Sequence, residues 1–308
     1  MATAYLTHPS SLRHDMGAGH PECPARIQAI ADQLNATGLL ALLEPHQAPA
    51  ATQEQLARVH AVDYIESIFR RSPQHGMVYL DPDTAMNPHS LEAALHAAGA
   101  AVKAVDLVMS GEADNAFCNI RPPGHHAGRD SAAGFCIFNN IAVAAAHALA
   151  QHGLQRVAIA DFDVHHGNGT DDIFNADPRV LLCSTFRHPY YPYRGVESAN
   201  EHMINVPLHA GASGTEFRTA VTEHWLPALQ HFQPQLLLIS AGFDAHVEDN
   251  MGGLALHDED YRWIGEILKE VAARHAKGRI VSILEGGYAL DALARNVLAH
   301  IKILAGMV

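Results

Sequence analysis

The stretch VAIADFDVHHGNGT (157–170) decides the fold and places the chemistry. Its first four residues, Val157–Ala160, form a short apolar run of the kind that buried parallel strands show. Two aspartates and two histidines follow within the next six residues. Since residues two apart on a strand point to the same side, we expect Asp161, Asp163 and His165 to share a face. The stretch therefore predicts a buried strand that carries ionisable side chains at its carboxyl end.

Four further apolar runs end in the same unusual way. In open parallel sheets, ligand sites lie outside the carboxyl ends of the strands. We therefore expect all five runs to deliver polar side chains to one edge of a sheet. The four runs are Ala116–Ile120, Val180–Cys183, Leu236–Ile239 and Ile280–Leu284, and they lead into RPPGHHAG (121–128), STFRH (184–188), SAGFDAH (240–246) and EGGY (285–288).

Helical patterns separate these runs. Thr52 is suited to cap one helix, and the glycines at 111, 153 and 278 are suited to end three others. The alternation of strands and helices predicts an α/β fold with a central, mostly parallel β-sheet flanked by helices. No repeat or linker-like segment divides the chain, so we expect a single domain over 1–308. The predicted helices cover about 24–37, 53–72, 89–110, 139–152 and 258–277.

The composition suits a globular protein with a sizeable core. The chain has 308 residues, of which 48% are hydrophobic, and 20 Lys+Arg against 33 Asp+Glu give a formal charge of −13. This acidic balance argues against nucleic acid and against anionic membrane surfaces as partners. The N-terminus shows no signal region, we find no membrane-spanning apolar run, and the four cysteines form no C-x-x-C pair. We therefore expect a cytoplasmic protein with free thiols.

The strand-end carboxylates and histidines predict a metal site. Asp163 and His165 make a pair of oxygen and nitrogen ligands for zinc, and Asp244 in SAGFDAH offers a third from another strand end. A catalytic zinc needs three protein ligands and one open position. A lone Asp-x-His is most often a solvated loop. The full D-x-D-x-H-H pattern after a buried strand favours the metal, and such a ligand set suits ferrous iron as well as zinc.

Two other segments carry side chains suited to hydrolytic chemistry. His125 and His126 follow a turn at the end of a strand, where they are either metal ligands or groups that transfer protons near neutral pH. Tyr288 follows Gly286 and Gly287, which let the chain turn sharply. Its phenol either donates a hydrogen bond to a developing oxyanion or packs on the core as an ordinary loop tyrosine.

Taken in order, the motifs resemble those of the histone deacetylase family, within the arginase/deacetylase superfamily. Asn168 stands where class I enzymes usually carry aspartate, so the chain is more similar to class II-type and bacterial deacetylase-like amidohydrolases. The motifs that carry the resemblance are GHPECPARI (19–27), RPPGHHAG, GFCIFNN (134–140), DFDVHHGNGT, SAGFDAH and EGGY.

The resemblance implies an arginase/deacetylase fold and a role for each of these side chains. One zinc ion would be held by Asp163, His165 and Asp244. His126 would act as general base and then protonate the leaving amine, with His125 as its electrostatic partner. Three further residues complete the implied set: Asp161 orients His125, Asn168 orients His126, and Tyr288 stabilises the tetrahedral oxyanion.

The resemblance also implies a structural ion and a substrate tunnel. A potassium ion would lie near the zinc, and hard oxygen ligands suit it. Two aromatic side chains would form the walls of a slender acyl-lysine tunnel. The implied potassium ligands are Asp161, Asp163, His165, Ser184 and Thr185, and the implied substrate contacts are Gly134, Phe135, Tyr191 and Met251.

We therefore predict a zinc-dependent amidohydrolase that removes an acetyl or other acyl group from an acyl-lysine, in a peptide or a small molecule, or from a related N-acyl amine. An acetylpolyamine amidohydrolase is the main alternative. Polyamine-selective relatives place a glutamate where Met251 stands, although Glu248 and Asp249 lie close in sequence. An arginase-like ureohydrolase with two manganese ions and a non-catalytic acyl-amine binding protein are less favoured. The sequence leaves the oligomeric state open, a homo-oligomer included.

Overall fold

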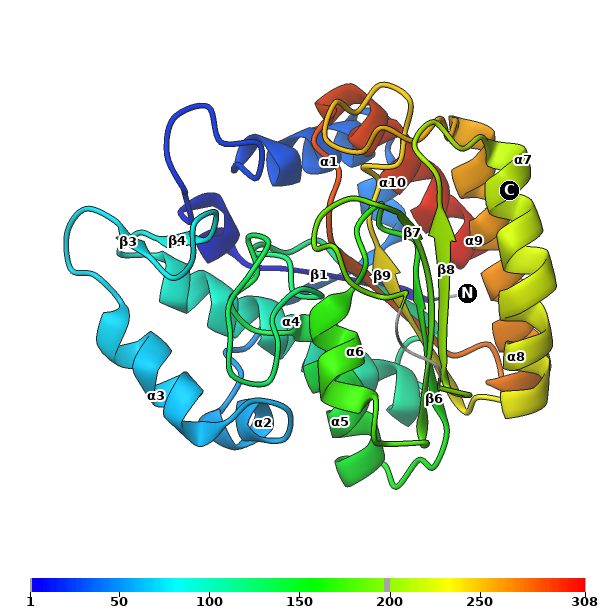
Figure 1. The fold of residues 1–308 in the computed structure, drawn as a ribbon, viewed down its shortest axis with the longest axis horizontal. Coiled ribbons are helices and arrows are strands. Elements are labelled where there is room, and N and C mark those ends of the chain that lie inside the picture. The colour runs from blue at the N-terminus through cyan, green and yellow to red at the C-terminus, as the bar shows by residue number, and fades with distance from the viewer. Residues whose placement is uncertain (1, 197–199, 308) are drawn as a thin grey trace.

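The central element is a wholly parallel sheet of eight strands, in the order β2-β1-β5-β10-β9-β6-β7-β8 (Figure 1). The computed structural model describes residues 2–196 and 200–307. The predicted α/β class with a parallel sheet is confirmed. The strands are β1 (Thr3–Thr7), β2 (Glu44–Gln47), β5 (Asn115–Cys118), β6 (Val157–Asp161), β7 (Val180–Arg187), β8 (Met203–Leu208), β9 (Leu236–Ala241) and β10 (Ile280–Leu284).

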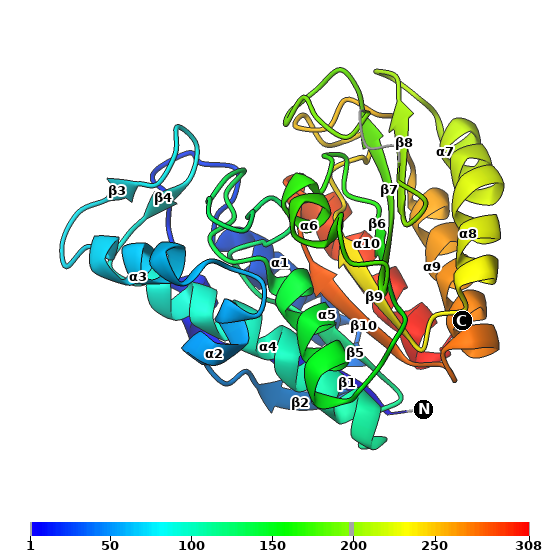
Figure 2. The ribbon, with the colours of Figure 1, turned by 60° about the horizontal axis from the view of Figure 1, so that its bottom comes forward.

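Helices cover both faces of the sheet (Figure 2). One face carries α2 (Gln53–Ala57), α3 (Val62–Arg71), α4 (Ser90–Ser110) and α5 (Asn140–Gln151). The other carries α1 (Ala25–Ala36), α7 (Gly214–Ala220), α8 (Leu226–Phe232), α9 (Asp258–His275) and α10 (Leu290–Ala305). The short α6 (Asn168–Phe174) follows β6, and the hairpin of β3 (Val78–Tyr79) and β4 (Ala85–Met86) stands apart from the sheet.

The apolar runs of the sequence become strands that are buried on both faces. In β6, Val157 and Ile159 pack into one core, whereas Ala158 and Ala160 pack into the other. The predicted strands match the observed ones to within a few residues. The exception is β7, which continues through Arg187, so that Ser184 and Thr185 lie within the strand and not in a loop after it.

The helix predicted over 53–72 is two helices, and this prediction is corrected. Thr52 does cap α2, and its hydroxyl accepts the Gln55 N–H. The chain then turns extended at Ala61, whose N–H donates to the Arg129 carbonyl at 2.8 Å. The ring of His60 also bonds the Gly128 carbonyl. Contacts with Gly128, at the end of RPPGHHAG, and with Arg129 after it therefore interrupt a helical pattern that local propensity would continue.

The helix α4 is long and apolar enough, by length and composition, to cross a membrane. Our expectation that the chain has no such segment is corrected to that extent. The helix packs against α5, β1, β5 and β10, and 67% of its apolar window is buried inside the fold. Its alanine-rich composition is therefore accounted for by its place in the core.

Gly99, in the middle of α4, tests how tightly this helix packs. A Cβ there would overlap the backbone carbonyl oxygen of Pro49, which cannot shift cheaply. We expect Gly99→Ala to lower the free energy of unfolding by about 2 kcal/mol, although alanine normally favours a helix. Urea unfolding followed by circular dichroism measures the change.

The control is Gly265→Ala in α9, where the nearest atom would be a methyl of the Ile303 side chain at 3.2 Å. This change should stay within about 1 kcal/mol of wild type, because helix propensity offsets a small side-chain shift. Equal losses for both variants would contradict the close contact between α4 and the segment that contains Pro49.

Candidate metal centre and active site

Three ligand-type side chains meet at the carboxyl edge of the sheet. Asp163 and His165 follow β6, and Asp244 follows its neighbour β9. All three are buried, and one potential ligand atom of each lies within 4.8 Å of the others. His165 Nδ1 is 3.0 Å from Asp163 Oδ1 and 3.2 Å from Asp244 Oδ2. The parallel pairing of β6 and β9 thus brings together residues that are about eighty positions apart in the sequence.

The surroundings of this cluster suit a cation. Asp244 Oδ2 is buried, and apart from His165 Nδ1 it has no close polar partner among the described residues. Gly242 and Gly286 border the cluster, and a Cβ at either position would overlap the Asp163 or Asp244 carboxylate. The two carboxylates and the imidazole nitrogen are suitable ligands for a divalent metal ion such as zinc. The two glycines leave space for the ion between them.

The electrostatics of the cluster point the same way. Burial and the neighbouring Asp163 charge raise the pKa of Asp244 to about 7. Burial disfavours a charged His165, but the hydrogen bonds and charges of the two aspartates outweigh it and raise its pKa to about 10. Without a metal, a proton on His165 offsets part of the buried negative charge. A bound cation would take over that task.

Two histidines stand beside the cluster, each held by a partner. His125 Nδ1 lies 3.0 Å from Asp161 Oδ2, and His126 Nδ1 lies 2.7 Å from Asn168 Oδ1. Because the Asn168 oxygen can only accept, His126 Nδ1 donates and the lone pair of its Nε2 stays free. Gly134 lies against His126, and a Cβ at this position would overlap the His126 ring.

The two histidines differ in charge state. Burial and the positive charges of His125 and His165 lower the pKa of His126 well below its ordinary value. Burial also disfavours a charged His125, but Asp161 and Asp163 outweigh it and raise the pKa of His125 well above the ordinary value. His126 is therefore a neutral base beside a cationic neighbour, and burial raises the pKa of the Tyr288 phenol so that it keeps its proton.

These groups line one pocket of about 290 Å³. Aromatic rings form much of its wall: Phe135 meets Tyr288 edge-on with ring centroids 6.0 Å apart, and Tyr191 meets His126 at 5.1 Å. Tyr190 stacks on His165 at 5.6 Å. The pocket is lined by Asp83, Pro123, His125, His126, Gly134, Phe135, His165, Tyr190, Tyr191, Met251, Gly286 and Tyr288. The structure therefore brings all four predicted substrate contacts to the pocket that holds the histidines and the tyrosine.

The residues predicted for potassium lie on the neighbouring strands β6 and β7 or directly after β6. Ser184 in β7 pairs with Asp161 in β6, and its buried hydroxyl has no hydrogen-bond partner among the described residues. Thr185 is the next residue of the same strand, and a strand directs successive side chains to opposite faces. The side chains of Ser184 and Thr185 therefore point to opposite faces of the sheet, and the predicted potassium ligand set, Thr185 included, stays a prediction.

Glu248 and Asp249, which sequence reasoning offered as partners for a cationic substrate, are both occupied. The Glu248 carboxylate pairs with Arg295 at 2.7 Å. The Asp249 carboxylate is buried and accepts the backbone N–H groups of Tyr288, Ala289 and Met251. Met251 does line the pocket, as predicted from its place in the sequence.

Sequence reasoning missed Asp83, which lies on the pocket wall. It belongs to the turn between β3 and β4, far from the sheet in sequence, and its carboxylate accepts the Gly134 N–H at 3.2 Å. The Thr84 hydroxyl accepts the Phe135 N–H at 3.0 Å. The segment DPDT (81–84) could have pointed to a functional turn. A short polar turn, however, shows no periodicity that distinguishes it from other loops.

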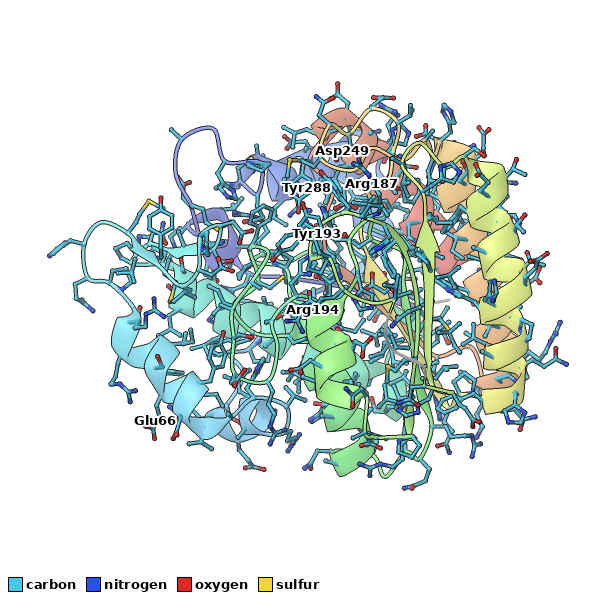
Figure 3. All side chains as sticks on the ribbon, viewed as in Figure 1. Glu66, Arg187, Tyr193, Arg194, Asp249 and Tyr288 are labelled. Carbon is cyan, nitrogen blue, oxygen red and sulfur yellow. The ribbon has the colours of Figure 1, made fainter. Side chains whose placement is uncertain are left out.

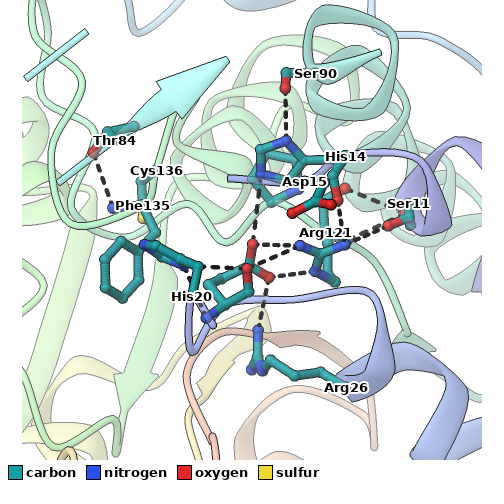
Figure 4. A network of polar contacts seen from close by, with 12 residues as sticks. Ser11, His14, Asp15, His20, Arg26, Thr84, Ser90, Arg121, Phe135 and Cys136 are labelled. Carbon is teal, nitrogen blue, oxygen red and sulfur yellow. Dashed lines mark hydrogen bonds and ion pairs between the residues drawn. The ribbon is translucent and has the colours of Figure 1, made fainter. Parts of the chain in front are cut away.

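A buried ionic network behind the pocket was missed as well (Figure 4). Glu22 receives hydrogen bonds from the guanidinium groups of Arg121 and Arg26, and all three side chains are fully buried. Arg26 also donates to the carbonyls of Gly287 at 2.6 Å and Glu285 at 2.5 Å, and lies 5.0 Å from the Tyr288 ring centroid. Part of the GHPECPARI motif thus supports the EGGY loop from behind.

Comparisons with known proteins agree with this geometry. A family model described as "Histone deacetylase domain" matches residues 20–304. The chain is 40% identical over 297 residues to a histone deacetylase-like amidohydrolase of Pseudomonas aeruginosa, covering 94% of this chain and 78% of that one. It is 36% identical over 318 residues to a probable deacetylase of Archaeoglobus fulgidus, covering 99% and 87%.

Two further likenesses bear on substrate and fold. The chain is 36% identical over 308 residues to the mouse protein named polyamine deacetylase HDAC10, covering 92% of this chain and 45% of that one. The crystal structure of the HDA15 HD domain superposes with a TM-score of 0.93 at 34% identity, covering 99% of this chain and 88% of that one.

Gly286 provides a test of the metal centre that leaves every ligand in place. A Cβ at this position would overlap the Asp244 carboxylate and press on Asp163. We expect Gly286→Ala to reduce the affinity for Zn²⁺ by at least about tenfold, as supporting contacts of metal sites do when they are lost. Competition with a chromophoric chelator measures the affinity, with Gly265→Ala as the control. Wild-type affinity in Gly286→Ala would contradict the placement of the ion between these carboxylates.

Proposed function

We propose that this chain, which belongs to the histone deacetylase family, is a metal-dependent amidohydrolase that removes an acetyl or other acyl group from an acyl-lysine or a related N-acyl amine. One observation carries the proposal. The ligand cluster, a neutral histidine and a protonated tyrosine converge on one pocket with aromatic walls. Amide hydrolysis needs an activated water, a proton for the leaving amine and a donor for the oxyanion, and the pocket offers a group for each.

Asp163, His165 and Asp244 would hold the metal ion, with zinc as the expected occupant. When bound, such an ion lowers the pKa of water and polarises a carbonyl as a Lewis acid. Because two of its three protein ligands are carboxylates, its Lewis acidity is reduced and the other groups of the pocket matter more. A potassium ion would lie between β6 and β7, where the buried hydroxyl of Ser184 adds an oxygen ligand beside Asp161.

His126 is placed to move the proton. Its Nδ1 hydrogen is engaged by Asn168, so its Nε2 faces the pocket as an acceptor. It takes a proton from the attacking water and later delivers one to the amine, which is a poor leaving group until it is protonated. Burial and the charge of His125, which Asp161 holds in place, keep the pKa of His126 low. His126 therefore gives the proton up readily to the leaving amine.

Tyr288 supplies the oxyanion donor. Its hydroxyl stays protonated because burial raises its pKa, so it can donate to the substrate carbonyl as negative charge develops on that oxygen. Phe135 and Tyr191 hold the alkyl chain of an acyl-lysine between them, and Met251 closes the pocket with an apolar side chain. These walls favour an uncharged acyl-alkyl chain over a polycation.

The geometry disfavours the other candidates. A two-manganese ureohydrolase needs further bridging carboxylates, but the described cluster holds two aspartates and one histidine, and Asp161 is engaged by His125. A polyamine deacetylase needs a carboxylate at the mouth. Glu248 and Asp249 are both engaged elsewhere. Asp83 is the acidic residue of the described lining, and its carboxylate already accepts the Gly134 N–H and the Thr84 hydroxyl.

Activity should depend on the proton-moving and proton-donating groups. We expect Tyr288→Phe and His126→Ala each to lower kcat by at least about a hundredfold, because each removes a group that acts mainly in the transition state. Deacetylation of an acetyl-lysine peptide by the zinc-loaded protein measures kcat, and a chelator should abolish turnover. Near-normal kcat in Tyr288→Phe would contradict the assignment. The exposed Tyr79, replaced by Phe, is the control for loss of a tyrosine hydroxyl.

Substrate preference should follow the residue at position 251. We expect a higher kcat/KM for an acetyl-lysine peptide than for an N-acetylated polyamine. Met251→Glu should shift the ratio toward the polyamine by about tenfold, because one favourable ion pair at a partly desolvated mouth is worth ~1.4 kcal/mol. Met251→Gln, similar in size but neutral, controls for shape. A wild-type preference for the polyamine would move the proposed substrate class to polyamines.

A further inference from the structure

A buried carboxylate lies just behind the pocket wall. Asp249 belongs to the loop between β9 and α9 and is only 4% exposed. Its Oδ2 accepts the backbone N–H of Tyr288 at 2.6 Å and of Ala289 at 3.0 Å. Its Oδ1 accepts the backbone N–H of Met251 at 2.9 Å. Figure 3 shows Asp249 next to Tyr288 near the carboxyl edge of the sheet. One side chain thus holds two segments that both line the pocket.

The arrangement is specific to a carboxylate. In the part of the chain that the structure describes, no arginine, lysine or histidine forms an ion pair with Asp249, whereas the neighbouring Glu248 pairs with Arg295. Three backbone N–H groups provide its compensation. Burying a carboxylate is costly, and charge-assisted hydrogen bonds are the strong ones. The buried charge of Asp249 is therefore compensated only when both of its carboxylate oxygens accept these hydrogen bonds.

The EGGY loop needs such a restraint from outside. Gly286 and Gly287 precede Tyr288, and neither has a side chain that could anchor the turn. Gly287 also adopts a φ of +122°, which side chains rarely allow. Arg26 holds the loop from one side through the carbonyls of Glu285 and Gly287. Asp249 holds it at the next residue through the N–H of Tyr288. The Gly286 N–H also donates to Asp163 Oδ2 at 2.8 Å. The backbone around Tyr288 is therefore held by Arg26, Asp163 and Asp249 together.

We propose that Asp249 is a positioning residue that fixes the oxyanion donor Tyr288 and the pocket wall at Met251 relative to each other. The inference rests on the proposed function, because Tyr288 must donate to the substrate for its placement to matter. Displacement of a catalytic group by about 1 Å is enough to cost a hundredfold in rate. Asp249 acts through Tyr288 and does not line the pocket itself.

The variant Asp249→Asn separates the hydrogen-bonding role of the carboxylate from the space that the side chain fills. An asparagine has nearly the same shape, but only one of its two terminal atoms accepts a hydrogen bond. If its oxygen serves Tyr288 and Ala289, its NH₂ group meets the N–H of Met251, and the reverse placement is no better. One of the two held segments is therefore released. The matched control is Glu248→Gln, the same charge loss one residue earlier in an exposed ion pair.

The test is a double-mutant cycle with Tyr288→Phe. We expect Asp249→Asn to lower kcat for an acetyl-lysine peptide by at least about tenfold while KM changes less than about threefold. In the Tyr288→Phe background the same change should cost less than about twofold, because the group it positions is gone. Glu248→Gln should keep wild-type kcat. An equal loss from Asp249→Asn in both backgrounds would overturn the proposal, because it would mean that Asp249 acts independently of Tyr288.

A binding measurement gives a readout that does not depend on turnover. The probe is a peptide in which a trifluoromethyl ketone replaces the acetyl amide, since its hydrate mimics the tetrahedral state. Calorimetry should show that Asp249→Asn weakens this probe, though less than Tyr288→Phe does, and that the double variant binds it no more weakly than Tyr288→Phe alone. Unchanged affinity in Asp249→Asn, with Tyr288→Phe weakened, would overturn the proposal.

Folding and the proposed function are checked separately. Zinc content and thermal unfolding of each variant show whether the fold persists, and Asp249→Ser replaces Asp249→Asn in the same cycle if the latter does not fold. If Tyr288→Phe has wild-type kcat and wild-type probe affinity, the proposed function fails and the inference fails with it. If Tyr288→Phe is impaired but Asp249→Asn is not, only the inference about Asp249 fails.

Discussion

The burial of negative charge at one edge of the sheet is the constraint on which the rest of the structure depends. Asp163 and Asp244 lie side by side with almost none of their surface exposed, and the charge they carry must be offset. His165 offsets part of it. Gly242 and Gly286 leave the room that an ion needs, and a side chain at either position would fill it. Two buried carboxylates this close together lower the stability of the fold unless their charge is compensated. The residues of the site therefore indicate a bound cation.

Other buried acids hold the loops around this centre. Glu22 is compensated by two arginines, Glu285 accepts the N–H groups of Gly124 and His125, and Asp249 accepts three more backbone N–H groups. Each bridges segments that are distant in sequence. Since buried charge-assisted hydrogen bonds are strong and directional, they place flexible, glycine-containing loops as firmly as packing places the helices. The acidic residues of this chain thus serve its architecture as much as its chemistry.

Much of the fold and the site was predictable from residues alone, and the failures have identifiable causes. Strands such as β6 and β9 were found because they are buried on both faces and read as continuous apolar runs. The edge strand β2, EPHQ, carries no such signal. The break between α2 and α3 was missed because it depends on contacts of His60 and Ala61 with residues 128 and 129. The family resemblance was confirmed, and it supplied roles that spacing alone left open.

The sequence by itself determined that ionisable side chains follow five apolar runs, and hence that one edge of a parallel sheet would carry the chemistry. Only the tertiary structure decided which of these side chains remain free to act. Asp83 came to the pocket from a separate hairpin. Glu248 and Asp249, which stand three and two residues before Met251, were instead engaged by Arg295 and by backbone N–H groups. The physical reason is that strand order and periodicity are local properties of the chain. The partner of a buried charge depends on segments that meet only when the chain has folded.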